Sequence, residues 1–300
     1  MGRVCASCNR YFDKYSFSNN QWRKPNGISR CHACACANGG GGGGDYVDPT
    51  QTARRNNPSE AIFEPGALIS PFAEGGFRCV AKGRYVKGPR AGQACVCKWF
   101  KSGAAFRSAY EETFSELDLQ AMNKALPIIE LWNSVGYINK LVHINIPEEE
   151  TFRNNPYYAG QKALLEPFIQ NYQKFNSNTG WADDSTPWAR AMQALSHYSY
   201  HITFRRVVLC DLQGGVYAKS VVLTDPVILS STKSFGVTDL GPQGISTFFS
   251  NHKCNEFCKS TWLVPRDQRQ YFRPQEGTSM MQPQAVSLRL SRPLKIAYAF

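Results

Sequence analysis

An unbroken run of six glycines at 39–44 constrains this 300-residue chain more than any other feature. Glycine loses more conformational entropy on ordering than any other residue, so such a run predicts a flexible linker. The Pro-, Asn- and Arg-rich stretch after it extends this linker over 38–60. We therefore expect a small module at 1–37, a large domain at 61–263 and a basic Pro- and Gln-rich tail at 264–300.

The small module contains two Cys-x-x-Cys pairs with 22 residues between them: Cys5, Cys8, Cys31 and Cys34. Four thiolates at this spacing can close a tetrahedron around Zn²⁺. A segment this short also needs such a ligand to fold. The pairs therefore predict a structural zinc site, with His32 and Cys36 as competing ligands for the last position.

An aromatic and basic insert, YFDKYSFSNNQWRK, lies between the two cysteine pairs. Its Phe-Ser-x-x-Gln pattern resembles a family of small zinc modules found in fungal heterochromatin factors and elsewhere. One interpretation is contact with a protein or nucleic acid through four side chains: Trp22, Arg23, Lys24 and Arg30. The alternative is an ordinary solvated basic face on a folded module.

The net charge of +11 is concentrated at the two ends of the chain. Residues 1–60 hold a surplus of four basic side chains and residues 259–300 a surplus of five, which leaves two for 61–258. A basic chain permits a nucleic-acid partner. This distribution assigns that hypothesis to the ends and leaves the large domain close to neutral.

The sequence lacks the signals of a membrane or secreted protein. No run of 18 apolar residues occurs, and the N-terminus has no apolar signal segment. The 11 cysteines are therefore expected in a reducing compartment, where metal binding is commoner than disulfides. We expect a cytoplasmic location, with the nucleus as the alternative, and no membrane partner.

The large domain is predicted to be α+β. Short apolar segments bounded by Gly and Pro predict strands at 77–81, 94–100, 140–146, 163–169, 206–211 and 216–224. Apolar residues spaced by three or four predict helices at 108–133, 188–197 and 244–262. Pro127 is expected to kink or end the first helix. Strands lead and helices are mixed in later, an order typical of the α+β class.

Two features of the first strands are typical of a phosphate site. A Gly75-Gly76-Phe77-Arg78 stretch opens one strand, where glycine amides and an Arg can approach phosphate oxygens. Lys98 lies in the middle of the apolar strand ACVCKWF and can direct a charge at an anion. The alternatives are a turn glycine pair and an ordinary exposed strand lysine.

A carboxylate ends the strand RVVLC, and a second lies further along the chain. These are Asp211 and, fourteen residues on, Asp225. Two such carboxylates can share Mg²⁺ with phosphate oxygens. The alternative is a polar turn with a capping aspartate.

A second metal site is predicted from His252-Lys-Cys254-Asn-Glu-Phe-Cys258. On the predicted closing helix, Cys254 and Cys258 would lie on one face, directly after His252. His197 is the expected fourth ligand, with His201 as the second choice. Four protein ligands would close the site, so we expect a structural zinc and no zinc-dependent hydrolysis.

Five segments in fixed order carry a family resemblance: ALSHYSYH, VVLCDLQGG, LTDP, FGVTDLGPQGISTFF and HKCNEFC. From about Phe72 to Trp262 the chain is similar to the alpha-kinases, which include myosin heavy chain kinase, elongation-factor-2 kinase and the kinase domains of some ion channels. The resemblance implies a two-lobed catalytic domain that transfers the γ-phosphoryl of Mg–ATP to a Ser or Thr hydroxyl of a protein. Conventional kinase signatures (HRD, DFG and APE) are absent.

The resemblance also implies roles for individual residues. Asp211 matches the catalytic aspartate, with Gln213 and Asp225 as the Mg²⁺-holding pair. Lys98 matches the lysine on the α/β-phosphates and Glu166 the acid that meets the adenine. The nucleotide-contacting set is Gly76, Arg78, Lys98, Glu166, Lys174 and Asn178, and the zinc set is His197, His252, Cys254 and Cys258.

Two points depart from the resemblance or stay open. The stretch between the DLQG and TDP motifs is lengthened by VYAKSVV. The acidic partner of Lys98 on the long helix is open among Glu111, Glu112 and Glu116. The Gly241-Pro-Gln-Gly244 turn is similar to the family motif that shapes the substrate-peptide surface. The alternative function is a non-catalytic pseudokinase scaffold that the zinc module recruits to nucleic acid or a protein.

Overall fold

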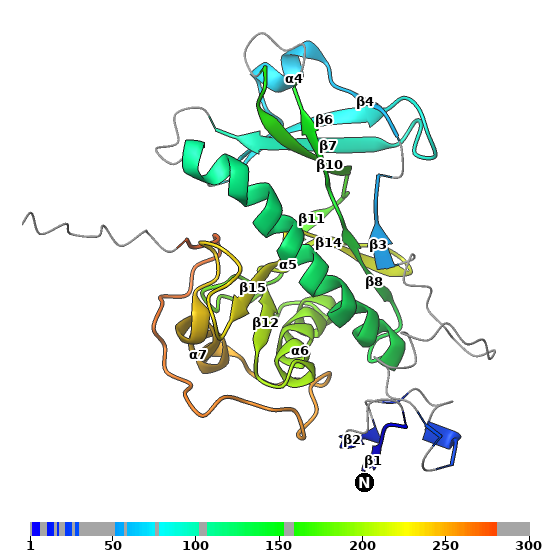
Figure 1. Ribbon diagram of the computed structural model, residues 1–300, viewed down its shortest axis with the longest axis vertical. Helices are drawn as coiled ribbons and strands as arrows, with labels where there is room; N and C mark the ends of the chain where they lie inside the picture. The colour runs from blue at the N-terminus through cyan, green and yellow to red at the C-terminus, as the bar shows by residue number, and fades with distance from the viewer. Residues whose placement is uncertain are drawn as a thin grey trace, which may run out of the picture.

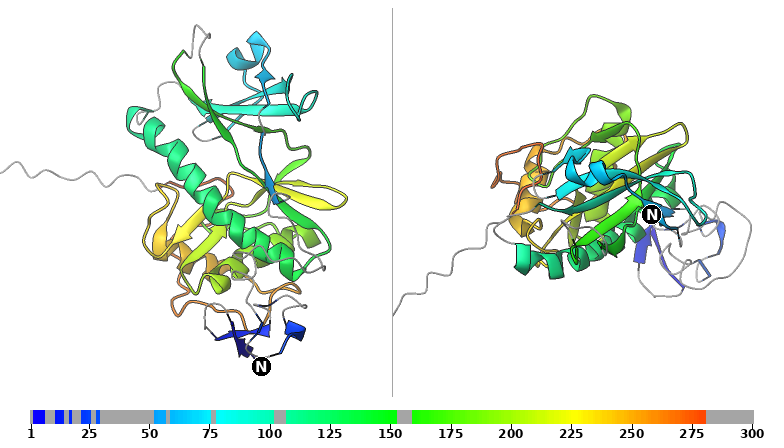
Figure 2. Two further views of the ribbon diagram at one scale, coloured as in Figure 1. Left: turned by 45° about the vertical axis from the view of Figure 1, so that its right-hand side comes forward. Right: turned by 90° about the horizontal axis from the view of Figure 1, so that it is seen from above.

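The computed structural model describes residues 2–6, 11–14, 17, 22–25, 28–29, 52–56, 59–75, 78–101, 107–152 and 159–280. One sheet occupies the upper part of Figure 1 and a second the middle, with two further helices below. The long helix α5 (Arg107–Val135) runs diagonally past both sheets and lies along one side of the body in Figure 2. Among the helices that the structure describes, none combines the length and apolar character that crossing a membrane requires.

The upper sheet has the strand order β4-β6-β7-β10-β9, with β5 paired to β6, and its pairs are antiparallel. Its strands are β4 (Ala61–Ile62), β5 (Ala73–Glu74), β6 (Arg78–Tyr85), β7 (Ala94–Phe100), β9 (Glu148–Thr151) and β10 (Lys162–Pro167). A short helix, α4 (Pro65–Ile69), packs near β6. Buried Cys97 and Trp99 of β7 belong to the small core on one face of this sheet. Side chains alternate along a strand, so Lys98 is directed to the other face.

The second sheet has the order β11-β13-β14-β8-β3. Its strands are β3 (Ala53–Arg54), β8 (Leu141–Asn145), β11 (Tyr172–Lys174), β13 (Gln213–Val216) and β14 (Ser220–Thr224). The pairs β14–β8 and β8–β3 are parallel and the others antiparallel. A separate antiparallel pair joins β12 (Val207–Cys210) to β15 (Val227–Ser230). Near the N-terminus, β1 (Gly2–Val4) pairs with β2 (Tyr11–Asp13).

The main core lies between α5, α6 (Pro187–Ile202), the second sheet and the β12–β15 pair. We call the part of the body around this core the lower lobe, and the upper sheet with α4 the upper lobe. Ile129 and Trp132 of α5 and Met192 and Leu195 of α6 are fully buried in it. Thr186 caps α6, because its hydroxyl accepts a hydrogen bond from the Ala189 amide at 3.1 Å. This core fixes α6, and α6 in turn carries polar side chains toward the candidate active site.

The predicted helix over 108–133 corresponds to α5, and it does not end at Pro127, because α5 continues to Val135. Ile128 and Ile129, directly after the proline, are buried, and their packing offsets a proline penalty of about 3 kcal/mol. The expected strand at 216–224 is two strands, β13 and β14, joined by a turn in which the Tyr217 amide donates to the Ser220 carbonyl at 2.8 Å.

The hairpin β13–β14 requires a glycine at one position. Gly214 has φ +156°, and a Cβ at this position would lie 1.8 Å from the Val222 carbonyl oxygen. No other residue fits this approach of the two backbones. The first glycine of the DLQGG segment therefore serves the pairing that places Gln213 beside Thr224.

The closing helix is shorter than expected. The prediction of a helix over 244–262 was wrong, because α7 (Gly241–Asn251) ends before the His/Cys segment. His252 has φ −69° and ψ 123°, which is extended backbone. From there to residue 280 the chain forms no helix or strand. Cys254 and Cys258 therefore do not share a helix face, and another geometry must bring them together.

Candidate active site

Lys98 lies at the centre of a buried charge cluster between the two sheets. Its ammonium forms ion pairs with Glu166 and Asp225 and donates a hydrogen bond to the Thr224 hydroxyl at 3.3 Å. Thr224 in turn donates to the Glu166 carboxylate at 2.7 Å. Lys98 is 9% exposed and Glu166 2%. Burial opposes the charge on Lys98, but Asp225 and Glu166 outweigh it and raise the pKa of Lys98, which keeps the ammonium charged.

Sheet register explains the contact between Lys98 and Glu166. In the antiparallel pair β7–β10, Leu164 lies opposite Lys98 and Glu166 opposite Val96. Lys98 and Glu166 are thus diagonal neighbours on one face, within reach of long side chains. The carboxylate of Glu166 therefore contacts Lys98 and Thr224, and the adenine contact expected for it stays a prediction.

Arg78 begins β6 and joins the same cluster. Its guanidinium forms an ion pair with Asp118 of α5 and lies 4.0 Å from Asp225. Burial raises the pKa of Asp118 although Arg78 opposes this. Sequence reasoning missed Asp118: it placed an acid from this helix on Lys98 and not on Arg78. Of the three acids expected in that role, Glu116 is exposed and bonded to Gln120, and the side chains of the other two lie outside the described residues, as does Gly76.

Asp211 lies directly after β12 and is held in a strained conformation. Asp211 has φ +56° and Asp225 φ +46°, a left-handed region that costs a non-glycine residue about 1 kcal/mol or more. Asn176 holds the segment through its side chain, because Oδ1 accepts a hydrogen bond from the Leu212 amide at 2.8 Å. Its amide group donates to Gln193 and Ser196 of α6, at 3.0 and 2.9 Å.

The carboxylate of Asp211 is 2% exposed and has several partners. Lys174 of β11 forms an ion pair with it at 2.9 Å. The Gln213 amide lies 3.4 Å from Oδ2 and also 3.4 Å from the Asp225 carbonyl. The Thr278 hydroxyl donates to Oδ2 at 2.7 Å. Burial raises the pKa of Asp211, although Lys174 and Thr278 oppose the shift.

These groups form one constellation from distant parts of the chain. Asp211, Gln213 and Asp225 offer the oxygen ligands that Mg²⁺ prefers. Lys98, Arg78 and Lys174 offer the cations that an anionic phosphate chain requires. Asn178 lies nearby and is fully buried, with its amide donating to the Thr238 carbonyl at 2.9 Å. The arrangement suits an Mg²⁺–polyphosphate ligand beside a buried carboxylate.

A second cluster contains the four predicted metal ligands. His197, His252, Cys254 and Cys258 offer ligand atoms that all lie within 4.8 Å of one another. The thiol of Cys254 lies 3.6 Å from His197 Nδ1, and that of Cys258 3.6 Å from His252 Nε2. The irregular segment after α7 folds back onto α6 to make this arrangement. His201 contacts the Leu263 amide at 3.4 Å and is not in the cluster.

The donor set of this cluster fits zinc. Two imidazoles and two thiols form a closed tetrahedral set of the kind found in structural sites. His197 Nε2 lies 3.1 Å from the Leu263 carbonyl, which fixes the tautomer and leaves Nδ1 for an ion. Burial lowers the pKa of His197 to about 4, so its imidazole is in the neutral form that binds a metal.

The N-terminal cysteine module is described only in part. Cys5 is buried beside the β1–β2 pair. Cys8, Cys31 and Cys34, and the competing His32 and Cys36, lie outside the described residues. The zinc predicted for this module therefore stays a prediction.

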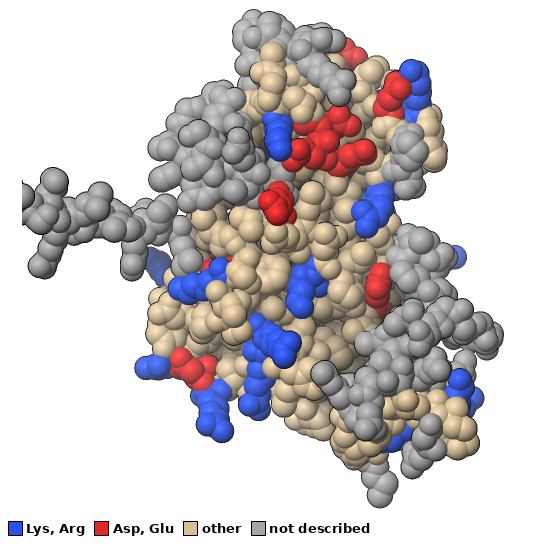
Figure 3. Space-filling model, viewed as in Figure 1, with Lys and Arg blue, Asp and Glu red and all other residues tan. Residues whose placement is uncertain are grey.

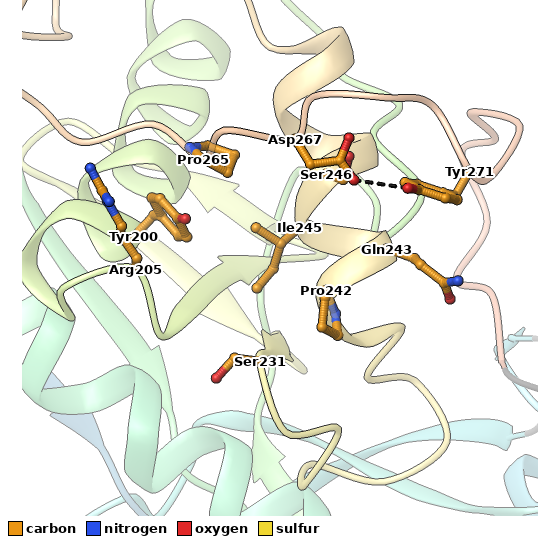
Figure 4. A pocket seen from close by; sticks show the side chains of 10 residues that line it. All are labelled: Tyr200, Arg205, Ser231, Pro242, Gln243, Ile245, Ser246, Pro265, Asp267 and Tyr271. Carbon is orange, nitrogen blue, oxygen red and sulfur yellow. Dashed lines mark hydrogen bonds between the residues drawn. The ribbon is translucent and has the colours of Figure 1, made fainter.

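A pocket lies away from the constellation, between the end of α6, the start of α7 and the chain after residue 264 (Figure 4). Tyr200 and Arg205 line one side, and Pro242 and Gln243 of the expected peptide-binding turn line another. Asp267 accepts a hydrogen bond from the Tyr271 hydroxyl at 2.8 Å at its rim. The lining contains none of the phosphate-binding or metal-binding candidates named above.

Charged side chains of the described residues are unevenly distributed over one face of the body. On the face drawn in Figure 3, acidic side chains gather over the upper lobe, where some basic ones also lie, and basic side chains predominate over the lower lobe.

Comparisons with known proteins identify relatives of residues 73–258, which match the model of the alpha-kinase family. The alpha-protein kinase vwkA of Dictyostelium discoideum is 30% identical over 206 residues, 65% of this chain and 31% of that protein. Human eukaryotic elongation factor 2 kinase is 33% identical over 133 residues, 42% of this chain and 17% of that protein. The chain thus spans less than a third of the length of these relatives.

Solved structures share the fold. An alpha kinase from Entamoeba histolytica matches with a TM-score of 0.55 at 20% identity, covering 73% of this chain and 84% of that one. The alpha-kinase domain of myosin-II heavy chain kinase A matches with a TM-score of 0.53 at 22% identity, covering 70% and 91%. At these identities the likeness concerns the fold alone.

Proposed function

Because the chain belongs to the alpha-kinase family, we propose that it is a protein kinase that transfers the γ-phosphoryl of Mg–ATP to a Ser or Thr hydroxyl. The observation that carries the proposal is the convergence of Lys98, Asp211 and Asp225 with their partners. These side chains come from β7, the end of β12 and the end of β14, and the fold brings them together with each charge facing an opposite one. Such a cluster matches the requirements of phosphoryl transfer, which are positioning and charge neutralisation.

We assign ATP contacts on the same basis. Lys98 and Arg78 would hold the phosphates, and Gln213 and Asp225 would hold Mg²⁺. Bound Mg²⁺ would neutralise charge on the phosphates. Asp225 already contacts Lys98, so its carboxylate lies where it can bridge the Lys98 ammonium and Mg²⁺. The Glu166 carboxylate is occupied by Lys98 and Thr224, which favours a role in positioning Lys98 over direct contact with adenine.

The transfer step needs a group that orients the acceptor hydroxyl. Asp211 would accept the hydroxyl proton as the oxygen attacks the γ-phosphorus and the bond to the β-phosphate breaks, leaving ADP. Lys174, 2.9 Å from the carboxylate, would hold it in place. The test of the whole proposal is the transfer of labelled phosphate from Mg–ATP to Ser/Thr peptides. Failure of the purified chain to bind Mg–ATP would remove it.

The pH profile should reflect the buried position of Asp211. Burial raises the pKa of this carboxyl, and only the deprotonated form can accept a proton. We therefore expect kcat/KM to fall on the acidic side with an apparent pKa above the ordinary value of about 3.9. Initial rates measured across acidic pH with a peptide substrate would check this. An acidic limb at or below the ordinary value would contradict the assignment.

We also propose that the second cluster holds a structural zinc, as the donor set indicates. Replacing Cys258 by Ser should remove the metal and lower the free energy of unfolding by about 2 kcal/mol, or roughly 4–8 °C in Tm for a domain of this size. Metal content by mass spectrometry and thermal unfolding provide the two measurements. Cys79→Ser, a cysteine distant in sequence from the cluster, is the control and should keep the metal.

Metal content also tests the N-terminal module. Two zinc ions per chain would support the second site proposed on Cys5, Cys8, Cys31 and Cys34, and one would support the His/Cys cluster alone. The rival function, a non-catalytic scaffold recruited to nucleic acid through this module, rests on the basic ends. A salt titration of DNA and RNA binding by the full chain tests the scaffold function, because affinity that depends on phosphate contacts falls steeply with salt. The absence of any salt-dependent affinity would remove recruitment to nucleic acid.

A further inference from the structure

A hydroxyl of this chain occupies the position where the acceptor of a phosphoryl group would lie. Thr278 Oγ1 donates a hydrogen bond to Asp211 Oδ2 at 2.7 Å. Lys174 Nζ, which pairs with the other oxygen of that carboxylate, lies 3.4 Å from the same hydroxyl. Thr278 is 67 residues from Asp211 in sequence, so this contact is set by the path of the C-terminal segment.

The segment around Thr278 is held by its backbone. Asn178, whose side chain is fully buried, donates from its amide to the Ser279 carbonyl at 2.7 Å and accepts from the Ser279 amide at 2.9 Å. Thr179 makes a matching pair with Gln275, donating to its carbonyl at 3.2 Å and accepting from its amide at 3.1 Å. These contacts bind main-chain groups on both sides of Thr278, which is how a site holds an extended peptide.

Residues 269–272, which precede this position in the chain, are also held by hydrogen bonds. The Thr247 hydroxyl of α7 accepts from the Tyr271 and Phe272 amides at 2.9 and 3.2 Å, and Ser246 donates to the Arg269 carbonyl at 2.8 Å. In Figure 1 the segment leaves the lower lobe and runs outside α7, in orange, before it turns back toward the body. These contacts fix the path of the segment and so place Thr278, and not a neighbouring residue, beside Asp211.

We propose that residues 275–279 are an intramolecular occupant of the acceptor-peptide position, and that Thr278 is phosphorylated by the active site of its own chain. This inference rests on the proposed kinase function. In the transfer, Thr278 Oγ1 forms a bond to the γ-phosphorus of ATP, the bond from that phosphorus to the β-phosphate oxygen breaks, and the hydroxyl proton passes to Asp211. The products are phosphothreonine at 278 and ADP.

The charge of the phosphorylated product determines where the segment lies after the transfer. A phosphate group carries about −1.5 to −2 at neutral pH and would lie against the buried carboxylate of Asp211. Like charges at this distance repel, and Lys174 is the cation that contacts Thr278 in the described structure. The phosphorylated segment should therefore leave Asp211, and the acceptor position then becomes free for a protein substrate. The segment is an inhibitor that its own phosphorylation removes.

The experiment incubates the full chain with Mg–ATP and maps phosphorylated residues by mass spectrometry. We expect phosphate on Thr278, with the same half-time in dilute and in concentrated protein, since the reaction is intramolecular. Phosphorylation of an added Ser/Thr peptide should show a lag that preincubation with Mg–ATP removes. Thr278→Val should lose the phosphate and the response to preincubation, whereas Thr261→Val, the same change at an exposed site, should keep both.

The outcomes separate this inference from the function on which it rests. If the wild-type chain phosphorylates the peptide but leaves Thr278 unmodified, the inference is overturned and the kinase function stands. A half-time that shortens in proportion to protein concentration overturns the intramolecular reaction. If no phosphate reaches either the peptide or the chain and Mg–ATP does not bind, the proposed function fails and this inference fails with it.

Discussion

Replacing Asp211 by Asn should lower kcat for peptide phosphorylation by about 10³-fold, while the chain still folds and binds Mg–ATP. General bases contribute about 10²–10⁴-fold, and here the carboxylate would also orient the acceptor hydroxyl. Asn keeps the shape of the side chain and its hydrogen-bonding oxygen, but it cannot accept the proton. It also removes the negative charge that faces Lys174 at 2.9 Å.

The measurement is a comparison of kcat with the dissociation constant for Mg–ATP, with thermal unfolding as a check on the fold. Glu256→Gln is a matched control, because it makes the same acid-to-amide change in a carboxylate paired with a cation, Arg190, at 2.9 Å on the surface. It should leave kcat nearly unchanged. An Asp211→Asn variant that retains about a tenth or more of wild-type kcat would show that the carboxylate is not the base.

Local patterns in the sequence predicted several of the strands that carry the site, but not β11, which carries Lys174. The apolar run ACVCKWF matches β7 residue by residue, and the expected strand before Asp211 is β12. The four residues of the His/Cys cluster were also predicted from residue type and spacing, although the helix assumed for two of them was wrong. This prediction of the cluster did not depend on the helix. A metal site requires that the ligand atoms lie close together, whichever helix, strand or loop carries them.

Partners across the fold could not be predicted in the same way. Whether Lys98 meets Glu166 depends on the register of β7 against β10, and no local pattern specifies that register. The sequence also does not show which acid of α5 faces Arg78. Each residue turns the helix by about 100°, so the rotation of α5 against the sheets decides that Asp118 is the one. Thr278 lies in a stretch without periodicity, so its contact with Asp211 is visible only in three dimensions.

Replacing Lys98 by Met should abolish ATP turnover and also lower the free energy of unfolding by about 3–5 kcal/mol, because removing one partner leaves a buried charge without compensation. Glu166 is 2% exposed and, within the described part of the chain, would lose the lysine with which it forms its ion pair. Asp225 is less affected, since Arg78 lies 4.0 Å away. Urea unfolding and Mg–ATP binding measure the two effects separately.

The double variant Lys98→Met/Glu166→Gln separates stability from catalysis. The amide introduced at position 166 carries no charge, and its carbonyl oxygen can still accept the hydrogen bond that Thr224 donates to the carboxylate at 2.7 Å in the wild type. Most of the lost unfolding free energy should therefore return. Mg–ATP binding should not return, because the cation that faces the phosphates is still missing.

Lys87→Met, which removes a surface lysine paired with Glu60, is the control for the lysine replacement. It should change the free energy of unfolding by no more than about 1 kcal/mol, because exposed ion pairs contribute little, and it should leave Mg–ATP binding as in the wild type. Recovery of ATP binding in the double variant would mean that Lys98 serves the fold and not the nucleotide. Loss of binding together with recovered stability would place the Lys98 ammonium on the phosphates, with Glu166 as the group that positions it.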